Sequence, residues 1–256
     1  MSEPSAGRAQ EGAGLRAPCE LLDWDSDFFG MRIARLLPAR IEPRAVAQAA
    51  SWARSAGVRC LYWLADPDGV DSLLMAQEVG FRLVDVRVEL ERQLARPPAE
   101  VHPDVRLLQP DDVPGLVRIA RASHHESRFY ADPGFPNERC DDLYATWIEK
   151  SCAGWADAVQ VARSKEDEPI GYLSCHAKQD GSGQIGLVAV GREARGRGIG
   201  RGLVDASLRW FAQRDLASAR VVTQARNVGA LRLYETAGFR TASVRFWFHL
   251  WPSDRE

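Results

Sequence analysis

The chain has 256 residues, of which 45% are hydrophobic, and its 33 basic and 35 acidic residues give a formal net charge of −2. This length suits one large domain or two ordinary ones, with a core that needs no disulfide or metal. The composition argues against a disordered chain and against a nucleic-acid binder with a generally basic surface. Five scattered cysteines without CxxC or zinc-like spacing predict reduced thiols, no metal site and a cytoplasmic location. We expect neither a signal peptide nor a membrane span, because residues 1–18 lack an apolar core segment and every apolar run is far shorter than about 18 residues.

The first part of the chain predicts a small α/β domain. Residues 1–18, rich in Gly, Ala, Ser, Glu and Pro, predict a mobile tail. Between 31 and 94 the pattern alternates as strand, helix, strand, helix, strand: 31–37, 43–56, 58–64, 69–79 and 81–90. The last strand has valines at alternate positions, which places Asp85 on its less apolar face. Prolines 97, 98 and 103 predict a linker at 96–103 between a domain at 19–95 and a second domain at 104–256.

The second domain is also expected to be mixed α/β. A short strand, two helices separated by a loop, and three strands are predicted at 105–108, 112–122, 138–151, 158–163, 170–177 and 184–190. A helix from about 199, a strand, a helix and a last strand follow, the last three at 219–225, 228–237 and 241–251. Asn227 is expected to cap the second of these helices, and Gly238 to end it.

A weak internal repeat connects the two parts. The strand at 58–64, a helix and then Gly80-Phe81-Arg82 parallel the strand at 219–225, a helix and then Gly238-Phe239-Arg240. The repeat favours two domains of related topology. The alternative is that helix-to-strand connections in general favour Gly at the helix end, followed by an aromatic residue.

The turn at 191–200 carries the most informative chemical pattern. It joins a strand to a helix, so that backbone N–H groups converge at a helix N-terminus, which is a site for an anion. Gly198 and Gly200 would let a pyrophosphate approach the backbone closely. Seven arginines against three acids between 192 and 220 favour a polyanionic ligand. The pattern is neither a Walker loop, since no GK[ST] follows, nor a Rossmann turn, since no acidic ribose ligand follows.

This turn, Arg195-x-x-Gly198-x-Gly200, resembles the acetyl-CoA signature of the GCN5-related N-acetyltransferase (GNAT) superfamily. Downstream, Asn227-x-x-Ala230-x-x-x-Tyr234-x-x-x-Gly238-Phe239 is similar to the next element of that superfamily. The resemblance implies an α/β GNAT fold with a mixed central sheet, preceded here by the smaller α/β domain. It implies acetyl-CoA as co-substrate, without a metal, held by Val188, Val190, Arg195, Gly196, Arg197, Gly198, Ile199, Gly200, Asn227 and Tyr234.

A narrower resemblance extends over both domains. Segments 22–30, 80–85, 127–129, 147–149 and 223–224 look like the TDP-fucosamine acetyltransferase family. That family acetylates the C4 amine of a TDP-linked 4-amino-4,6-dideoxy sugar. The likeness begins near residue 21, whereas a generic acetyltransferase would account only for residues after about 104.

The reaction implied by the resemblance is direct attack of a neutral amine on the thioester, through a tetrahedral oxyanion. The backbone N–H of Val190 is expected to hold the oxyanion, with Val188 contacting pantetheine, and the side chains of both residues also suit a core strand. Tyr234 is the expected general acid for the leaving thiolate, because a phenol with a pKa of about 10 stays protonated at neutral pH. The alternative for Tyr234 is a core residue beside Leu231.

Asp85 is the expected general base, acting through water. An ordinary aspartate has a pKa of about 3.9 and is a poor base for an ammonium group, so the site needs burial or a water chain. The competing bases are His124, His125 and Glu126, although adjacent histidines in a polar loop are more often solvated than catalytic. Acceptor binding is expected from Ser127, Arg128 and Phe129, with a surface arginine as the alternative for Arg128. Two roles are open for Asp23, Trp24, Phe28 and Phe29: they line the acceptor site, or they belong only to the core of the first domain.

The two resemblances imply an acetyl-CoA-dependent N-acetyltransferase that acts on a nucleotide-linked amino sugar. One alternative is acetylation of a peptide, a polyamine or an antibiotic amine. The other is a non-catalytic acyl-CoA-binding module that regulates a partner. We expect a small-molecule acceptor and no nucleic-acid or membrane partner, with a homodimer as the candidate assembly.

Overall fold

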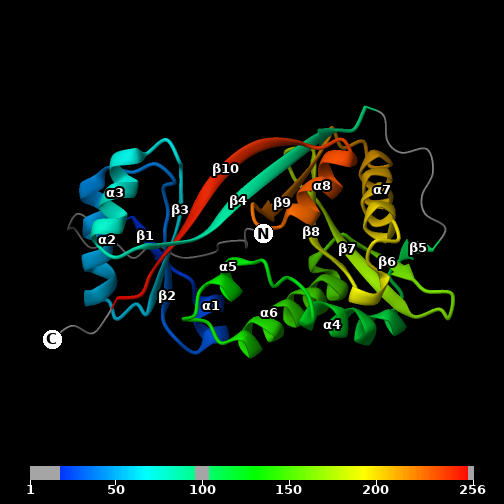
Figure 1. Cartoon of the computed structure of the whole chain (residues 1–256), viewed down its shortest axis with the longest axis horizontal. Coiled ribbons are helices and arrows are strands. Elements are labelled where there is room, and N and C mark those ends of the chain that lie inside the picture. Colours follow the sequence, from blue (N-terminus) through cyan, green and yellow to red (C-terminus); the bar gives the residue numbers. More distant parts are fainter. Residues whose placement is uncertain (1–17, 96–103, 253–256) are drawn as a thin grey trace. The chain divides into compact units, whose positions relative to one another are not determined.

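A computed structural model of the chain describes residues 18–95 and 104–252, which form two compact units (Figure 1). The described part of the first unit is 18–87 and 244–252, and that of the second is 88–95 and 104–243. The predicted linker at 96–103 and the predicted tail, except residue 18, lie outside the described residues. The units divide within two long strands, β4 (Arg82–Gln93) and β10 (Arg240–Leu250), so both strands run through both units. The predicted domain boundaries at 95 and 104 stay a prediction.

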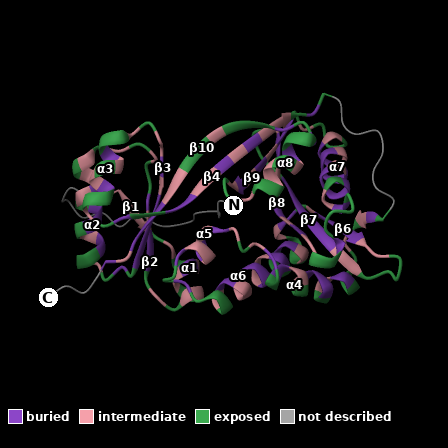
Figure 2. Ribbon diagram, in the orientation of Figure 1, coloured by how far each residue is buried: buried purple, intermediate pink, exposed green. Residues whose placement is uncertain are grey.

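The first unit is a small sheet with helices packed on one face. Strand β1 pairs antiparallel with β2, β2 pairs parallel with β3, and β3 pairs antiparallel with the end of β10. Its other elements are β1 (Cys19–Leu21), α1 (Asp23–Phe29), β2 (Ile33–Leu36), α2 (Pro43–Ser55), β3 (Cys60–Ala65) and α3 (Val70–Glu78). Its core joins the strands to α2 and α3, with Leu36, Val46, Leu61, Trp63 and Phe248 all buried (Figure 2).

The second unit contains the longer run of paired strands. Strands β5 to β8 are antiparallel neighbours in chain order, and β8 pairs parallel with β9. The strands are β5 (Val105–Leu107), β6 (Ala158–Arg163), β7 (Pro169–Ala177), β8 (Ser182–Val190) and β9 (Ser218–Gln224). The helices are α4 (Val113–Arg121), α5 (Arg128–Ala131), α6 (Asn137–Lys150), α7 (Ile199–Ala212) and α8 (Val228–Thr236).

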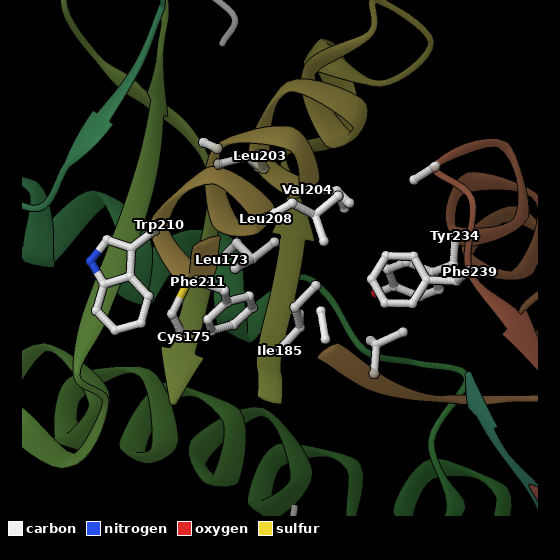
Figure 3. Packing of buried hydrophobic residues seen from close by; sticks show 14 of the residues in the cluster. Leu173, Cys175, Ile185, Leu203, Val204, Leu208, Trp210, Phe211, Tyr234 and Phe239 are labelled. Atoms are coloured by element: carbon white, nitrogen blue, oxygen red, sulfur yellow. The ribbon is translucent and has the colours of Figure 1, made fainter. Parts of the chain in front are cut away.

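Helices cover both faces of this second sheet. Leu116 of α4 and Ile148 of α6 pack with Val161, Leu187 and other residues on one face. On the opposite face α7 and α8 pack against β7, β8 and β9, and Figure 3 shows their side chains converging. The labelled members of this cluster are Leu173, Cys175, Ile185, Leu203, Val204, Leu208, Trp210, Phe211, Tyr234 and Phe239. Apolar burial of this kind contributes about 25 cal/mol per Å², which is why two-sided burial stabilises the sheet.

The predicted mixed α/β fold is confirmed, and each predicted strand and helix occurs within a few residues of its expected position. Among the strands and α-helices of the described residues, three short ones were not predicted: β1, α1 and α5. Helix α1 has only seven residues, and the Ser26 hydroxyl fixes it by donating to the Leu22 carbonyl at 2.7 Å and accepting from the Ile33 N–H at 2.9 Å. Such short elements depend on these tertiary contacts more than on periodicity. No helix among the described residues is long and apolar enough to cross a membrane.

The internal repeat corresponds to a shared topology in the two units. In each, an antiparallel pair (β1–β2, β7–β8) is followed by a helix, a parallel strand (β3, β9), a nine-residue helix and a long strand. Gly80 and Gly238 both follow the nine-residue helix with positive φ, 99° and 85°. In both units the next residue, a buried phenylalanine, donates its N–H to the carbonyl five residues earlier.

Candidate active site

Strand β8 parts from β9 before either strand ends. Their parallel pairing runs from Ser182–Ser218 to Ile185–Val221, and β8 continues beside β7 to Val190. The Gly191 N–H donates to the Ile170 carbonyl on the β7 side, so the backbone groups of Val190 point the other way. The amides of residues 188 and 190 are therefore turned away from β7, toward the side on which β9 has separated.

A β-bulge in β7 and β8 precedes this separation. The register of the two strands shifts between Leu173 and Cys175, and the Ser174 hydroxyl accepts the Leu187 N–H at 2.8 Å. A Cβ atom at position 186 would lie 2.5 Å from Ser174 Oγ, so Gly186 is required at this point. Because a bulge bends its strand and increases the local twist, it accounts for the divergence of β8 from β9.

The turn after β8 has the geometry of an anion cradle. Gly196 and Gly198 have φ of 75° and 79°, and a Cβ at either position would meet no atom within 4 Å. Gly198 is the N-cap of α7, whose first N–H groups have no partners within the helix. Arg192, Arg195 and Arg197 are exposed around them. These residues fit a pyrophosphate such as that of acetyl-CoA.

Two further contacts hold this turn in place. The Nε atom of Arg195 donates to the Val190 carbonyl at 3.0 Å, which joins the predicted cofactor turn to the end of β8. A Cβ at Gly200 would lie 3.3 Å from Leu233 Cδ2, so Gly200 also permits the close approach of α7 and α8. The sequence showed the need for small residues here, but not this packing reason.

Helix α8 carries Tyr234. Its N-cap is Asn227, as predicted, and the Asn227 side chain accepts the Ala230 N–H at 3.1 Å. The Tyr234 ring is 4% exposed and packs against Phe239 with ring centroids 5.8 Å apart (Figure 3). Burial raises the pKa of its phenol, which therefore stays protonated at neutral pH. The hydroxyl makes no hydrogen bond to any described residue. The ring is thus a core residue with a protonated hydroxyl, and the role of Tyr234 as general acid stays a prediction.

Asp85 lies in the part of β4 that belongs to the first unit. It is 3% exposed, and its Oδ1 atom accepts the N–H of Val86 at 2.8 Å. The predicted alternation of β4 holds only in part, because Asp85 is buried together with Val84, whereas Val86 is half-buried. The burial that a catalytic role requires is present, and the role itself stays a prediction.

The loop between α4 and α5 holds His124 in a fixed position. Its Nε2 atom lies 2.9 Å from the hydroxyl of Tyr172 on β7, and its ring stacks on Tyr144 of α6, with centroids 4.3 Å apart and planes at 13°. Burial, with smaller effects from His125 and Arg195, lowers the pKa of His124 to about 3. The imidazole is therefore neutral at physiological pH. His124 is half-buried, and its stacking and its contact with Tyr172 fix the ring more firmly than expected of a solvated loop histidine, while its role as a base stays a prediction.

His125 is exposed, but its ring meets the Tyr130 ring edge-on, with ring centroids 4.7 Å apart. The Tyr130 hydroxyl donates to Asp141 Oδ1 at 2.5 Å, and burial raises its pKa. Glu126 is half-buried in the same loop. Sequence patterns did not single out Tyr130, Tyr144 or Tyr172, which join this loop to α6 and β7, because such contacts between distant segments leave no local signal.

The predicted acceptor-binding residues, Ser127, Arg128 and Phe129, follow this loop in the chain. Ser127 is 4% exposed, and its hydroxyl has no hydrogen-bond partner among the described residues. Phe129 is buried against Phe135 and Trp147, and the Arg128 guanidinium lies 4.1 Å from the Phe129 ring centroid.

The aromatic residues of α1 lie in the first unit. The Trp24 and Phe28 rings stack 5.2 Å apart, and Phe29 meets Phe28 edge-on at 5.1 Å. All three are half-buried and lie outside the apolar cluster under α2 and α3, whereas Asp23 is exposed. The prediction that they form an acceptor wall is not tested by these contacts.

Comparison with known proteins agrees with this geometry. Residues 119–239 match the model of the Acetyltransferase (GNAT) family. The GCN5-related N-acetyltransferase from Sphaerobacter thermophilus has a similar fold, with a TM-score of 0.63 and 17% identity over 91% of this chain and 75% of that chain. The matched residues include β6 to β9, the glycine turn and α8.

Two relatives of known name are similar in sequence. The "Spore coat polysaccharide biosynthesis protein SpsD" of Bacillus subtilis is 28% identical over 56% of this chain, and the match spans 49% of that relative. The "Mycothiol acetyltransferase" of Rhodococcus jostii is 27% identical over 90% of this chain and 82% of that relative. The class predicted from the sequence, an acetyl-CoA-dependent N-acetyltransferase, is the class of this family. The splayed strand, the glycine turn and α8 thus all lie within residues 119–239, the part of the chain that matches the GNAT acetyltransferase family, and the fold agrees with that match.

Proposed function

We propose that this protein transfers the acetyl group of acetyl-CoA to the amine of a nucleotide-linked amino sugar, a TDP-linked 4-amino-4,6-dideoxyhexose. The observation that carries acetyl transfer is the splayed end of β8, next to the open glycine and arginine turn at 195–200. Two findings support the sugar acceptor. The sequence resembles a sugar-nucleotide acetyltransferase family over both domains, and a relative takes part in spore coat polysaccharide biosynthesis.

Each chemical task has a proposed residue. The Val190 N–H donates to the oxyanion of the tetrahedral intermediate, and a donor in such a role contributes about 10²–10³ in rate. Tyr234 gives its proton to the leaving CoA thiolate, for which a buried and protonated phenol is suited. Asp85 accepts the proton of the attacking amine through water. Val188, Gly196, Arg197, Gly198 and Ile199 contact the cofactor, together with Arg195, Gly200 and Asn227.

A second acceptor is favoured by the share of each relative's length that the sequence match covers. The match to a mycothiol acetyltransferase extends over 82% of that protein, whereas the match to the spore coat protein spans 49%. The amine precursor of mycothiol is therefore the competing acceptor. A non-catalytic acyl-CoA-binding module is less well supported, because it needs neither the splayed strand nor a protonated Tyr234.

A thiol-release assay separates these functions. Purified protein is mixed with acetyl-CoA and, in turn, with TDP-linked amino sugars, UDP-linked amino sugars, the mycothiol precursor, a polyamine and a peptide amine. The proposal expects the highest kcat/KM with a TDP-linked 4-amino sugar. Faster turnover of the mycothiol precursor would favour the second acceptor, and binding of acetyl-CoA without turnover of any amine would favour the binding module.

A further inference from the structure

The loop at 123–127 holds two polar groups that have no protein partner. His124 has φ of 66°, and the loop is closed by the Ser127 N–H, which donates to the His124 carbonyl at 3.0 Å. The Nδ1 atom of His124 hydrogen-bonds to no group in the described ranges, and the same holds for the buried hydroxyl of Ser127. Buried polar groups are almost always satisfied, so the unsatisfied Ser127 hydroxyl points to a ligand, and the half-buried His124 offers a second polar group in the same loop.

The contact with Tyr172 decides which nitrogen of His124 carries the proton. Tyr172 is 0% exposed, and its hydroxyl contacts no other hydrogen-bonding group among the described residues. An unbonded O–H in the interior is costly, so the hydroxyl donates to Nε2. The imidazole is neutral and has a single proton, which must then lie on Nδ1. His124 therefore offers an uncharged N–H donor.

The position of this donor connects it to the acetyl-transfer site. Tyr172 pairs with Ala189 on β8, one residue before Val190, and lies on the sheet face that α4 and α6 cover. The Arg195 guanidinium of the cofactor turn is close enough to influence His124 electrostatically. His124 is thus held by Tyr144 of α6 and by Tyr172, whose β-sheet partner, Ala189, precedes Val190 on β8.

We propose that His124 is a specificity-determining residue whose Nδ1–H, fixed by Tyr172 and Tyr144, donates to an oxygen neighbouring the acceptor amine. Ser127 completes this subsite. An uncharged donor attracts the lone pair of a hydroxyl or carbonyl and gains nothing from an alkylammonium, so the preferred acceptor is an amine with an adjacent oxygen. This inference rests on the proposed acetyl transfer and deepens it, because an amino sugar has such a hydroxyl.

Two substitutions separate the two nitrogens of His124. In His124→Asn the side-chain amide lies where Nδ1 was, and asparagine tolerates positive φ. In His124→Gln the amide reaches the position of Nε2 and can bond to Tyr172, but the Nδ1 donor is lost. Each variant is assayed with an amino alcohol and its deoxy analogue, using the pair that the wild type acetylates fastest. Because the acceptor pair is chosen by the rate of the wild type, this test does not depend on the acceptor being a nucleotide sugar. The thiol-release assay tests that assignment by itself.

The wild type is expected to prefer the hydroxyl-bearing acceptor by about tenfold in kcat/KM, the usual value of a hydrogen bond to substrate. His124→Asn keeps part of this preference and His124→Gln loses it, while the affinity for acetyl-CoA stays unchanged in both. If Gln keeps the preference and Asn loses it, His124 only supports Tyr172 and the proposal is overturned. An equal preference in all three proteins, or an equal loss in both variants, also overturns it.

Positive φ could prevent the glutamine variant from folding, so its melting temperature is measured first. If it fails to fold, Tyr172→Phe replaces it, since this change removes one hydroxyl and leaves the ring in the core. The released imidazole should then lose most of the preference for the hydroxyl-bearing acceptor. An unchanged preference in Tyr172→Phe would overturn the proposal.

Discussion

The two units share a topology but differ at the turn that leads into the first long helix. In the second unit β8 leads to α7 through glycines with positive φ, and the N-cap is Gly198. In the first unit β2 leads to α2 through residues 37–42, with Glu42 as N-cap and Pro43 in the first turn. A proline has no N–H, and a carboxylate at the N-cap repels anions, so this end of α2 is closed to a phosphate.

The same contrast recurs in the second helix of each repeat. Tyr234 and Ala76 occupy equivalent positions, since each carbonyl accepts the N–H of the phenylalanine after the positive-φ glycine. The first unit therefore has the scaffold without the cofactor turn and without the hydroxyl. The two units therefore share a topology, whereas the glycine and arginine turn and the phenol, to which we assign the chemistry, occur among the described residues only in the second unit.

The largest expected effect comes from removing the Tyr234 hydroxyl, a group that the equivalent residue of the first unit, Ala76, also lacks. Tyr234→Phe should lower kcat by about 10²–10⁴, because the proton donor to the thiolate is lost while the buried ring remains. Steady-state kinetics with calorimetry of acetyl-CoA binding measures both quantities, and the affinity should not change. A decrease of less than about threefold, with chemistry shown to limit the rate, would leave Tyr234 as a packing residue.

The second prediction asks whether the first unit takes part in the chemistry. If Asp85 accepts the proton of the amine, Asp85→Asn should lower kcat/KM by about 10²–10⁴ at neutral pH. The loss should shrink at high pH, where the free amine is already abundant. The pH–rate profiles of the variant and the wild type, with the titration of the amine measured separately, provide the test. Parallel profiles would exclude Asp85 as base and leave its contribution as substrate binding.

The local structure of the proposed cofactor turn and of α8 could be predicted from the sequence. The glycine turn, the Asn227 cap and Tyr234 lie within 45 residues, and their spacing follows from local rules for turns and helix ends. The position of the splay could be expected only from the family resemblance. The bulge that produces it depends on Ser174 and Gly186, which meet across two strands.

The contacts of the proposed acceptor loop join distant segments of the chain, so they could not be predicted from the sequence. His124 is fixed by Tyr144 and Tyr172, which are 20 and 48 residues away. Hydrophobic periodicity places each tyrosine in the core but cannot show that both contact one imidazole. For this reason the polar neighbours of His124 favour a solvated histidine over a catalytic one, although its ring is stacked and hydrogen-bonded.

A third prediction tests the conformation of the cofactor turn. Gly198→Val should weaken acetyl-CoA binding by tenfold or more, about 1.4 kcal/mol, because its side chain enters the open space beside the N-terminus of α7. Gly181→Val is a matched control, since Gly181 has φ of 77°, is equally open and precedes the opposite end of β8. The control should lose comparable thermal stability and keep its affinity. Equal affinities in calorimetry of both folded variants would refute the cofactor assignment.

The smallest effect concerns charge and compares the two turns directly. Arg197 lies in the glycine turn, and Arg40 lies in the corresponding turn of the first unit, where it is paired with Asp66 and Asp68 at 3.6 and 3.4 Å. Arg197→Gln should weaken acetyl-CoA binding by about two- to fivefold at low salt, the range of an exposed ion pair. The difference from wild type should fade above about 0.5 M salt, where screening is strong. Arg40→Gln should bind acetyl-CoA like the wild type at every salt concentration, because the turn in which it lies ends at Glu42 and Pro43. A similar loss in both variants would mean that the net charge of the protein, and not the glycine turn, attracts the cofactor.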